Sequence, residues 1–293
     1  MILPKPLKRA LRGAAHRFGY DVVPLNGANT AVTPPATVEP EPQDADSSPP
    51  ADADAPAPIQ GPAGPLVFPP DIDEATQATV EAVWPYTMTS VHRVMALCDA
   101  VRYISRNAIP GDVVECGVWR GGSMLAVART LLELTDMSRD LWLYDTFQGM
   151  PEPASVDRRI YDRASAAEVL QNSDRDSNYW AVSTLDEVKA TMRQCAYPEE
   201  RLHFVAGMVE ETIPTNDPTR IALLRLDTDW YESTRHELRH LVPRMSPGGV
   251  MIIDDYGDWA GARLAVDEYL REQDLHVFLH RIDHTGRLII MPA

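Results

Sequence analysis

The feature that most constrains the fold is a regular alternation of short apolar runs with amphipathic segments, which extends from residue 112 to the end of the chain. Five apolar runs predict strands: DVVECGV (112–118), LWLYD (141–145), LHFVAG (202–207), IALLRLD (221–227) and VMIIDD (250–255). Segments between and after them have helical periodicity, at 123–134, 185–196, 233–245 and 261–273. Near-continuous apolar strands that alternate with helices predict an α/β fold with a mostly parallel sheet covered on both faces.

Further signals extend this prediction at both ends. Residues 89–106 have the apolar periodicity of a buried helix, which Pro110-Gly111 ends. Thr184 and Glu187 have the spacing of a capping box and predict where the helix at 185–196 begins. Runs at 276–282 and 287–292 flank a turn at 283–286 and predict a C-terminal antiparallel hairpin. We therefore expect one domain over residues 71–293.

Two segments precede this domain. Residues 25–70 are rich in proline, alanine and aspartate, and they have too little apolar surface to offset the entropy cost of ordering, so we expect a disordered linker. Residues 3–20 have helical spacing of apolar residues between basic ones, and the whole segment 1–24 is basic. One interpretation is an amphipathic helix that contacts an anionic membrane surface or a partner. A short packed helix is the simpler interpretation, and we favour it.

Charge and cysteine content exclude several classes of protein. The net charge is −16, and residues 25–83 contain acidic residues but no lysine or arginine. An acidic domain is a poor partner for nucleic acid. Three cysteines without paired spacing argue against a disulfide framework and indicate a reducing compartment. We expect a cytoplasmic protein, located at the inner membrane face if the N-terminal segment binds lipid.

The first predicted strand leads into a glycine-rich turn, Glu115-Cys116-Gly117-Val118-Trp119-Arg120-Gly121-Gly122-Ser123. Glycines between a strand and a helix allow backbone N–H groups and the helix N-terminus to approach a ligand closely. The pattern is neither GxGxxG nor a Walker A loop. A tight structural turn explains the glycines alone, but the position after the first strand favours a binding site.

Acidic residues end three of the predicted strands. Asp145 ends the second, where a carboxylate can accept hydrogen bonds from ribose hydroxyls or can cap a turn. Asp227 and Asp229 end one later strand, and Asp254 and Asp255 end the next. Unpaired carboxylates at neighbouring strand ends would repel each other, and Mg²⁺, which prefers oxygen ligands, relieves this repulsion. Each aspartate alone is more often a cap or turn residue.

Four runs in this order resemble the macrocin O-methyltransferase family of bacterial sugar O-methyltransferases: IPGDVVECGVWRGGS, LYDTFQGMP, LRLDTDWYEST and SPGGVMIIDDYG. The resemblance covers roughly residues 85–292. It implies the Rossmann-like class I methyltransferase fold with a seven-stranded sheet, S-adenosylmethionine and Mg²⁺ as cofactors, a small-molecule or glycan substrate, and self-association.

The resemblance also implies roles for individual residues. Asp227, Asp254 and Asp255 would hold the metal, and Asp227 would also be the general base, whereas the role of Asp229 stays open. Residues 150–180 would form a mobile substrate lid. The cofactor would bind to Glu115, Gly117, Trp119, Arg120, Gly121, Gly122, Ser123, Asp145 and Phe147.

Two alternatives remain within this fold. One is a metal-dependent methyltransferase for catechols or phenols, a type that presents Asp-Asn where this chain has Asp254-Asp255. The other is a non-catalytic binding module. An NAD-dependent oxidoreductase is disfavoured because its GxGxxG pattern is absent after the first strand. His236 and His240 have ordinary helix-surface spacing, and His284 lies in the predicted turn.

Overall fold

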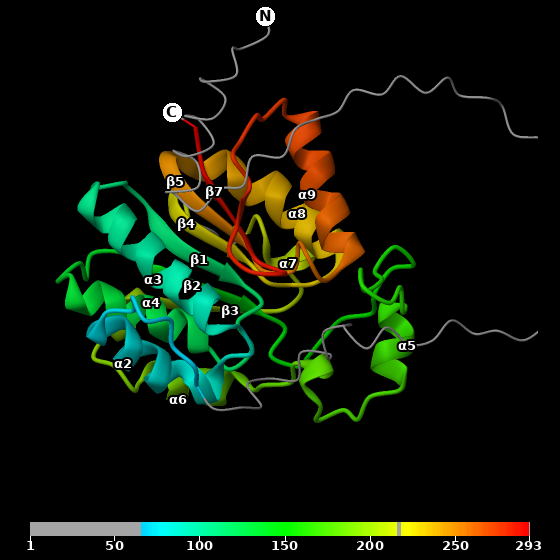
Figure 1. Cartoon of the computed structure of the whole chain (residues 1–293), viewed down its shortest axis with the longest axis horizontal. Coiled ribbons are helices and arrows are strands. Elements are labelled where there is room, and N and C mark those ends of the chain that lie inside the picture. The colour runs from blue at the N-terminus through cyan, green and yellow to red at the C-terminus, as the bar shows by residue number, and fades with distance from the viewer. Residues whose placement is uncertain (1–65, 216–217, 293) are drawn as a thin grey trace, which may run out of the picture. The chain divides into compact units, whose positions relative to one another are not determined.

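A computed structural model of the chain describes residues 66–215 and 218–292. In this part of the chain, seven strands form one sheet in the order β3-β2-β1-β4-β5-β7-β6 (Figure 1). Strands β1 to β5 are parallel, whereas β7 runs antiparallel to both β5 and β6. The predicted α/β fold, with its parallel sheet and antiparallel C-terminal hairpin, is confirmed.

The strands are β1 Asp112–Cys116, β2 Leu141–Asp145, β3 Leu202–Ala206, β4 Ile221–Leu226, β5 Met245–Ile253, β6 His280–Arg281 and β7 Arg287–Ile290. The α-helices are α2 Glu74–Val83, α3 Val91–Arg106, α4 Gly122–Glu133, α5 Ala166–Gln171, α6 Leu185–Met192, α7 Val209–Thr212, α8 Tyr231–Leu241 and α9 Ala260–Glu272. Four short 3₁₀ helices join them in the described chain: η1 Trp84–Tyr86, η2 Asn178–Trp180, η3 Glu199–Arg201 and η4 Val242–Arg244.

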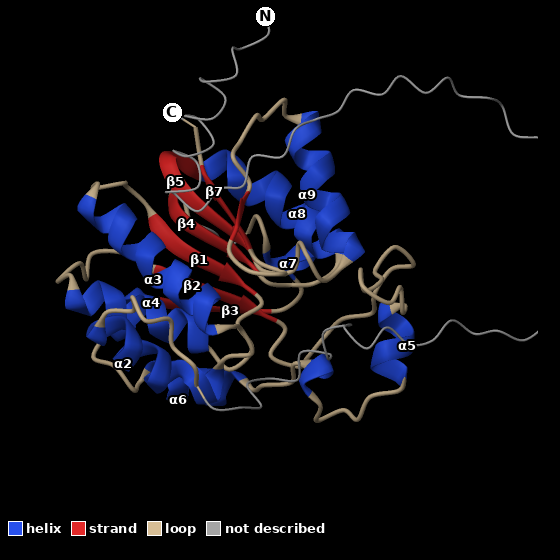
Figure 2. Cartoon of the chain, in the orientation of Figure 1, coloured by secondary structure: helices blue, strands red, loops and turns tan. Residues whose placement is uncertain are grey.

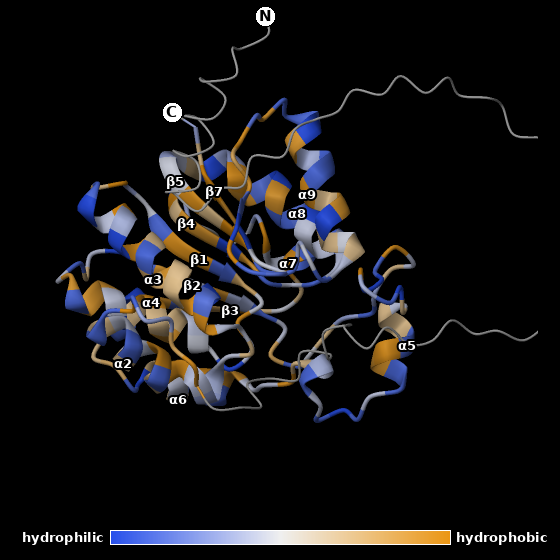
Figure 3. Ribbon diagram, viewed as in Figure 1, coloured by the Kyte–Doolittle hydropathy of each residue, from blue (hydrophilic) through white to orange (hydrophobic). Residues whose placement is uncertain are grey.

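Helices cover both faces of the sheet (Figure 2). Side chains of α2, α3, α4 and α6 form one apolar cluster with one face of the strands, and side chains of α7, α8 and α9 form a second cluster with the other face. The apolar character of the central strands is plain in Figure 3. Burial on both faces explains why these strands read as continuous apolar runs in the sequence.

Several element boundaries differ from the sequence prediction. The helix expected at 233–245 begins at Tyr231 and ends at Leu241, because Pro243 cannot continue it and the chain forms η4 instead. The strand expected at 250–255 begins five residues earlier, at Met245. The first strand of the hairpin, β6, is shorter than expected and pairs with β7 over His280–Arg281 only. It lies at the edge of the sheet, so β7 is its one neighbour in the strand order.

The N-terminal border of the domain contains a helix that the sequence did not reveal. Asp73 caps α2 by accepting a hydrogen bond from the Thr76 amide. Before it, Leu66 and Phe68 pack against the apolar core, although we expected residues up to 70 to belong to the linker. The expectations for residues 1–24 and 25–65 concern residues outside the described range. Within that range, none of the helices is long and apolar enough to cross a membrane.

The strand order determines where a ligand can bind. Strand β1 pairs with β2 on one side and with β4 on the other, so the chain runs outward from β1 in both directions. In parallel α/β sheets this switch point opens a crevice beyond the carboxyl ends of the strands. The loops after β1 and β4 pack closely there, because a Cβ atom on Gly117 would lie 2.0 Å from the carbonyl oxygen of Asp227.

We expect Gly117→Ala to destabilise the protein by at least about 3 kcal/mol, because the new methyl group would collide with rigid backbone. Gly121→Ala is the matched control: its φ is +81°, close to the +83° of Gly117, but its Cβ would meet the Val188 methyl at 3.1 Å. The control should lose about 1 kcal/mol, the cost of the left-handed conformation. Chemical denaturation without ligands measures both, and equal losses would contradict the steric argument.

Candidate active site

One cavity lies beyond the carboxyl ends of the parallel strands, and it brings together most residues that the sequence analysis selected. It is lined by nine of them: Glu115, Gly117, Trp119, Gly122, Ser123, Asp145, Asp227, Asp254 and Asp255. Segments that are far apart in the sequence thus meet at a single edge of the sheet, as the parallel arrangement requires.

Three predicted cofactor residues do not line the cavity wall as the structure describes it. The Arg120 guanidinium stacks over the Trp119 ring, with 4.7 Å between its carbon and the ring centroid. Gly121 is the N-cap of α4, and Phe147 is buried in the apolar core.

Left-handed backbone conformations and one carboxylate fix the conformation of the glycine turn. Gly117 and Trp119 have φ of +83° and +46°. Asp145 Oδ2 accepts hydrogen bonds from the amides of Val118 and Trp119, both at 2.9 Å. Its Oδ1 accepts one from the Phe147 amide at 2.7 Å. Burial raises the pKa of Asp145, whereas these amides lower it.

Asp145 therefore has a structural function whether or not a ribose binds. Its carboxylate joins the turn after β1 to the turn after β2, which the sequence analysis had considered as the alternative to ribose binding. The same side chain lines the cavity. Each carboxylate oxygen offers two lone pairs; Oδ2 already accepts two amide hydrogen bonds, so a ribose hydroxyl would donate to Oδ1.

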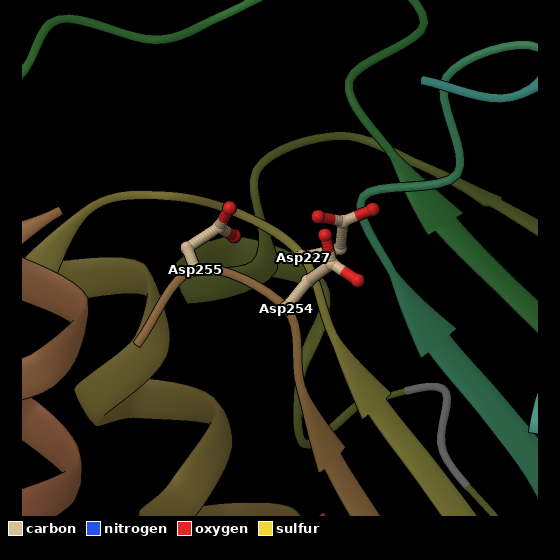
Figure 4. A group of neighbouring side chains, drawn as sticks. All are labelled: Asp227, Asp254 and Asp255. Atoms are coloured by element: carbon tan, nitrogen blue, oxygen red, sulfur yellow. The ribbon is translucent and has the colours of Figure 1, made fainter. Parts of the chain in front are cut away.

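Three aspartates form the acidic centre of the cavity. The carboxylates of Asp227, Asp254 and Asp255 each have an oxygen within 4.8 Å of the others. Figure 4 shows the three side chains on the loops beyond β4 and β5. Among the described residues, this is the one group of acidic, histidine or cysteine side chains with metal-ligand spacing. The strand pattern predicted that the acidic residues after these two strands lie close together, and the family resemblance selected these three.

Two buried arginines balance part of the negative charge. Arg225, on β4, donates hydrogen bonds to Glu115, Asp227 and Asp254. Arg93, on α3, donates to Asp254 and also pairs with Asp283 at 3.0 Å. Only 4% of the Arg225 side chain and 6% of the Arg93 side chain is exposed, so both charges act where water screens little.

The two arginines do not match all of the acidic residues, so the cavity keeps an excess of acidic groups. Burial raises the pKa of Asp227 to about 6, against the lowering effect of Arg225. Burial and the neighbouring carboxylates raise the pKa values of Asp229 and Asp255 well above the usual range. Burial likewise raises the pKa of Glu115 to about 8. Such shifts are typical of functional sites, although structural ion-pair networks also cause them.

The donor set fits a hard divalent cation. It consists of carboxylate oxygens, the ligands that Mg²⁺ prefers. The two arginines leave Asp229 and Asp255 without a compensating charge in the described contacts, and a cation beside them would supply it. Both oxygens of Asp254 accept from arginines, but each keeps a second lone pair. Asp229 and Asp255 lie close enough to influence each other's pKa, but Asp229 does not belong to the group of Asp227, Asp254 and Asp255.

Aromatic and lid residues complete the cavity wall. Trp230 and Trp259 meet edge to face, with ring centroids 4.9 Å apart. Trp230 donates from Nε1 to the carbonyl of Pro151 at 3.1 Å, which ties it to the lid. His236, His240 and His284 are absent from the described cavity wall. His236 contacts the Ile213 carbonyl, the His240 ring lies tilted against His236, and His284 is exposed.

A buried carboxylate fixes the lid at its base. Asp157 Oδ1 accepts from the Tyr231 amide at 2.8 Å, at the start of α8, and Oδ2 accepts from the Ala154 amide at 2.7 Å. A Cβ on Gly261 would lie 1.8 Å from this carboxylate, so α9 also packs against it. Further backbone bonds join Arg158 to Ala260 and Ile160 to Asp258. The lid base is therefore part of the folded domain.

Sequence reasoning missed Arg93, Arg225 and the segment Tyr86–Thr89, all of which contribute to the site. A signal existed for Arg225, because an arginine inside the apolar run IALLRLD must find buried partners. Arg93 lies on a helical face that was selected for its apolar residues. Residues 86–89 have no periodicity and no glycine pattern, so nothing in the sequence distinguished them.

Comparison with known proteins agrees with this geometry. Residues 69–289 match the family model described as macrocin-O-methyltransferase (TylF). The chain belongs to the macrocin-O-methyltransferase family. It is 35% identical over 206 residues to an 8-demethyl-8-(2,3-dimethoxy-alpha-L-rhamnosyl)-tetracenomycin-C 4'-O-methyltransferase of Streptomyces olivaceus, covering 69% of this chain and 76% of the relative. It is 36% identical over 207 residues, with the same coverage, to a demethyldecarbamoylnovobiocin O-methyltransferase of Streptomyces niveus.

A solved structure agrees with the sequence matches. The O-methyltransferase NovP superimposes with a TM-score of 0.62 at 32% identity, covering 71% of this chain and 83% of that chain. The calicheamicin methyltransferase CalS11, at 18% identity and a TM-score of 0.53, shares the fold. This member of the macrocin-O-methyltransferase family is thus an O-methyltransferase of the class I fold.

We expect Arg225→Gln to lower the free energy of unfolding by about 3–5 kcal/mol, because the buried carboxylates of Glu115 and Asp254 and the partly exposed one of Asp227 lose their shared cation. Arg193→Gln is the control, since Arg193 pairs with Glu199 on the surface, with both side chains more than half exposed. Its loss should stay below about 1 kcal/mol. Urea denaturation compares the two, and a small loss for Arg225→Gln would show that the network is not stabilised by its charge.

The Asp283–Arg93 pair predicts a dependence of stability on pH. Arg93 is the main cause that lowers the pKa of Asp283 to about 2, and bonds from Ser90, Thr285 and Gly286 add to it. The ionised form is thus favoured in the fold, and its contribution is present above about pH 4 and lost as the pH falls towards 2. Asp283→Asn should cost about 2 kcal/mol at pH 7.

Denaturation at pH 7 and at pH 3 provides the measurement, with exposed Asp274→Asn as the control. The difference between wild type and Asp283→Asn should shrink at the lower pH. A difference that stays constant would contradict the assigned role of the charge.

Proposed function

We propose that this chain transfers the methyl group of S-adenosylmethionine to a hydroxyl group of a sugar or a glycosylated natural product, with the assistance of Mg²⁺. The observation that carries the proposal is the convergence of Asp227, Asp254 and Asp255 in the cavity that also contains the glycine turn. The names of the two Streptomyces relatives, which act on a rhamnosyl tetracenomycin and on a novobiocin precursor, support the acceptor class.

The turn side of the cavity suits the methyl donor. Gly117 and Gly122 line the cavity and let the backbone at Asp227 and at Tyr86 pack against the turn, and Trp119 adds an aromatic surface. Asp145 is positioned to accept from ribose hydroxyls, in keeping with its location at the end of the second strand. S-adenosylmethionine supplies an electrophilic methyl group when it is bound.

The acidic side of the cavity suits activation of the acceptor. When bound by these carboxylates, Mg²⁺ would supply stabilisation of negative charge on an acceptor oxygen. Asp227 can accept the hydroxyl proton, because a carboxylate with a pKa of about 6 is a stronger base than an ordinary aspartate and is still ionised at neutral pH. Arg225 and Arg93 hold the carboxylates of Asp227 and Asp254 in place.

Apolar side chains complete the acceptor side. Trp230, Trp259, Tyr179 and Met150 line the cavity near the acidic residues and the lid. Aromatic surfaces combined with a few polar groups are typical of small-molecule sites. Such a wall can pack against the apolar face of a sugar or its aglycone, and it excludes water from the carboxylates.

A catechol or phenol acceptor is the second candidate within the same chemistry. Asp255, at the position where enzymes of that type present asparagine, favours the sugar acceptor. A non-catalytic module has no need for the carboxylate convergence, so we place it last.

Calorimetry with S-adenosylmethionine, in Mg²⁺ and then in EDTA, tests the donor. We expect binding in both conditions, because the glycine turn and the acidic centre are formed by different segments. Turnover on a panel of glycosides and catechols should require Mg²⁺ and should prefer the glycosides. Failure to bind S-adenosylmethionine in either condition would contradict the proposal.

Loss of a metal-binding carboxylate should affect rate more than donor binding. We expect Asp255→Asn to lower kcat at saturating donor by at least about 100-fold, with less than about a threefold change in donor affinity. Exposed Asp274→Asn is the control and should leave both quantities unchanged. The assignment is wrong if Asp255→Asn weakens donor binding by more than about threefold while kcat at saturating donor stays unchanged.

A further inference from the structure

Three arginines gather outside the cavity, where the C-terminal hairpin meets α9. Arg281 and Arg287 are direct partners in the register of β6 and β7. The side chains of such antiparallel partners point to the same face of the sheet, with Cβ atoms about 5 Å apart. Arg263, in the first turn of α9, stacks on the same Tyr256 ring as Arg287, with guanidinium carbons 5.3 and 5.1 Å from the ring centroid. We call Arg263, Arg281 and Arg287 the arginine cluster.

The arginine cluster has fewer acidic partners than positive charges. Like charges directly opposite each other on paired strands destabilise a sheet. In the described part of the chain, Asp267 is the one carboxylate that forms an ion pair with the cluster: its Oδ2 lies 3.7 Å from Arg263 Nε, and both side chains are close to half exposed. Asp283 also attracts the hairpin arginines, but its carboxylate is paired with Arg93 at 3.0 Å. The cluster therefore keeps an excess of positive charge in a chain whose net charge is −16.

Arg287 differs from every other buried arginine that the structure describes. The other four each form an ion pair with a carboxylate: Arg93, Arg102, Arg139 and Arg225. Arg287 instead donates from Nη1 alone to the backbone carbonyls of Asp283, Thr285 and Gly286. Burial and then the positive charge of Arg281 lower the pKa of Arg287. Its buried charge is thus balanced by carbonyl dipoles and an aromatic ring, without a carboxylate.

A bound anion would relieve the repulsion within the cluster. Nε and Nη2 of Arg287 have no hydrogen-bond acceptor among the described residues, and exposed Arg281 opens the cluster to solvent. The planar fork of a guanidinium group matches two oxygens of a phosphate, and such charge-assisted pairs are stronger than neutral hydrogen bonds. Stacking on one ring also restricts two of the three guanidinium groups, so less entropy is lost when an anion binds.

We propose that the arginine cluster binds a phosphate group through the guanidinium groups of Arg263, Arg281 and Arg287. This site lies outside the cavity that contains the glycine turn and the aspartates, and it does not depend on methyl transfer. Soluble phosphate esters and lipid headgroups share the phosphate chemistry that the cluster recognises. The experiment therefore has one arm for each source.

Arg281→Gln removes one charge of the cluster without disturbing the core, because Arg281 is exposed. Arg271→Gln is the matched control. Arg271 is also exposed and its loss changes the net charge equally, but it lies eight residues after Arg263, about 12 Å further along α9. Without phosphate, Arg281→Gln should be at least as stable as wild type in urea denaturation, since it removes a like-charge pair from β6 and β7.

Titration calorimetry with pyrophosphate forms the first arm, at constant ionic strength and in EDTA, so that no metal bridges the anion to the acidic centre of the cavity. We expect wild type to bind, and we expect Arg281→Gln to weaken binding by about tenfold or more, as for the loss of charge-assisted hydrogen bonds. Arg281→Lys keeps the charge but not the fork and should have an intermediate affinity. Arg271→Gln should stay within about twofold of wild type.

Co-sedimentation with phosphatidylcholine vesicles, with and without phosphatidic acid, forms the second arm. The same variants are compared, since phosphatidic acid presents a phosphate monoester at the vesicle surface. If Arg281→Gln loses affinity for pyrophosphate only, the site takes a soluble phosphate ester. If Arg281→Gln also loses binding to the phosphatidic acid vesicles while Arg271→Gln keeps it, the site takes a lipid headgroup. Both results support the phosphate site.

Three results would overturn the inference. The first is a wild type that binds neither pyrophosphate nor the phosphatidic acid vesicles. The second is an equal loss in Arg281→Gln and Arg271→Gln, which would indicate a response to net charge instead of a site. The third is binding that is unchanged in Arg281→Gln, because the anion then binds elsewhere, for example at the basic segment 1–24.

Discussion

Arg225 places one guanidinium group beneath the ends of three neighbouring strands, where it donates to Glu115 on β1, to Asp227 after β4 and to Asp254 after β5. A charge this deeply buried is stable only with good partners, and the same holds for the carboxylates. The interaction therefore determines the positions of the acidic residues relative to one another. Arg93 extends it to Asp283 in the C-terminal hairpin.

The charge balance of this network explains the chemistry of the cavity. Glu115 and Asp254 are matched by arginines at close range, whereas Asp229 and Asp255 face one another with raised pKa values. The matched residues hold the geometry. Under the proposed function, Mg²⁺ would compensate the unmatched Asp255 together with Asp227 and Asp254.

Much of the fold could be predicted from the sequence, because a strand that is buried on both faces appears as a continuous apolar run. The runs at 141–145 and 202–207 became β2 and β3 almost residue for residue, and the capping box at Thr184 and Glu187 formed as expected. The direction of parallel strands predicted that the acidic residues after β4 and β5 lie close together, and the family resemblance selected Asp227, Asp254 and Asp255 among them.

What the sequence did not reveal depends on contacts between distant segments. Arg225 and Glu115 are 110 residues apart, and their pairing leaves no local pattern. Residues 86–89 and the chain around Asp157 at the lid base have irregular backbone, so periodicity in the sequence cannot detect them. The family resemblance assigned Phe147 and Arg120 to the cofactor, whereas in the structure neither side chain lines the cavity.

The attachment of the lid has a consequence for the range of acceptors that this architecture can serve. Partners at the lid base are largely backbone groups: the amides of Tyr231, Ala154, Ile160 and Ala260, and the carbonyls of Arg158 and Asp258. Backbone groups are present whatever the side chain is. Side chains further along the lid can therefore be exchanged while the loop stays attached and the charge network beneath it stays intact. The architecture thus separates a loop with exchangeable side chains from a fixed electrostatic centre, and under the proposed function this loop is the segment in which to redesign acceptor preference.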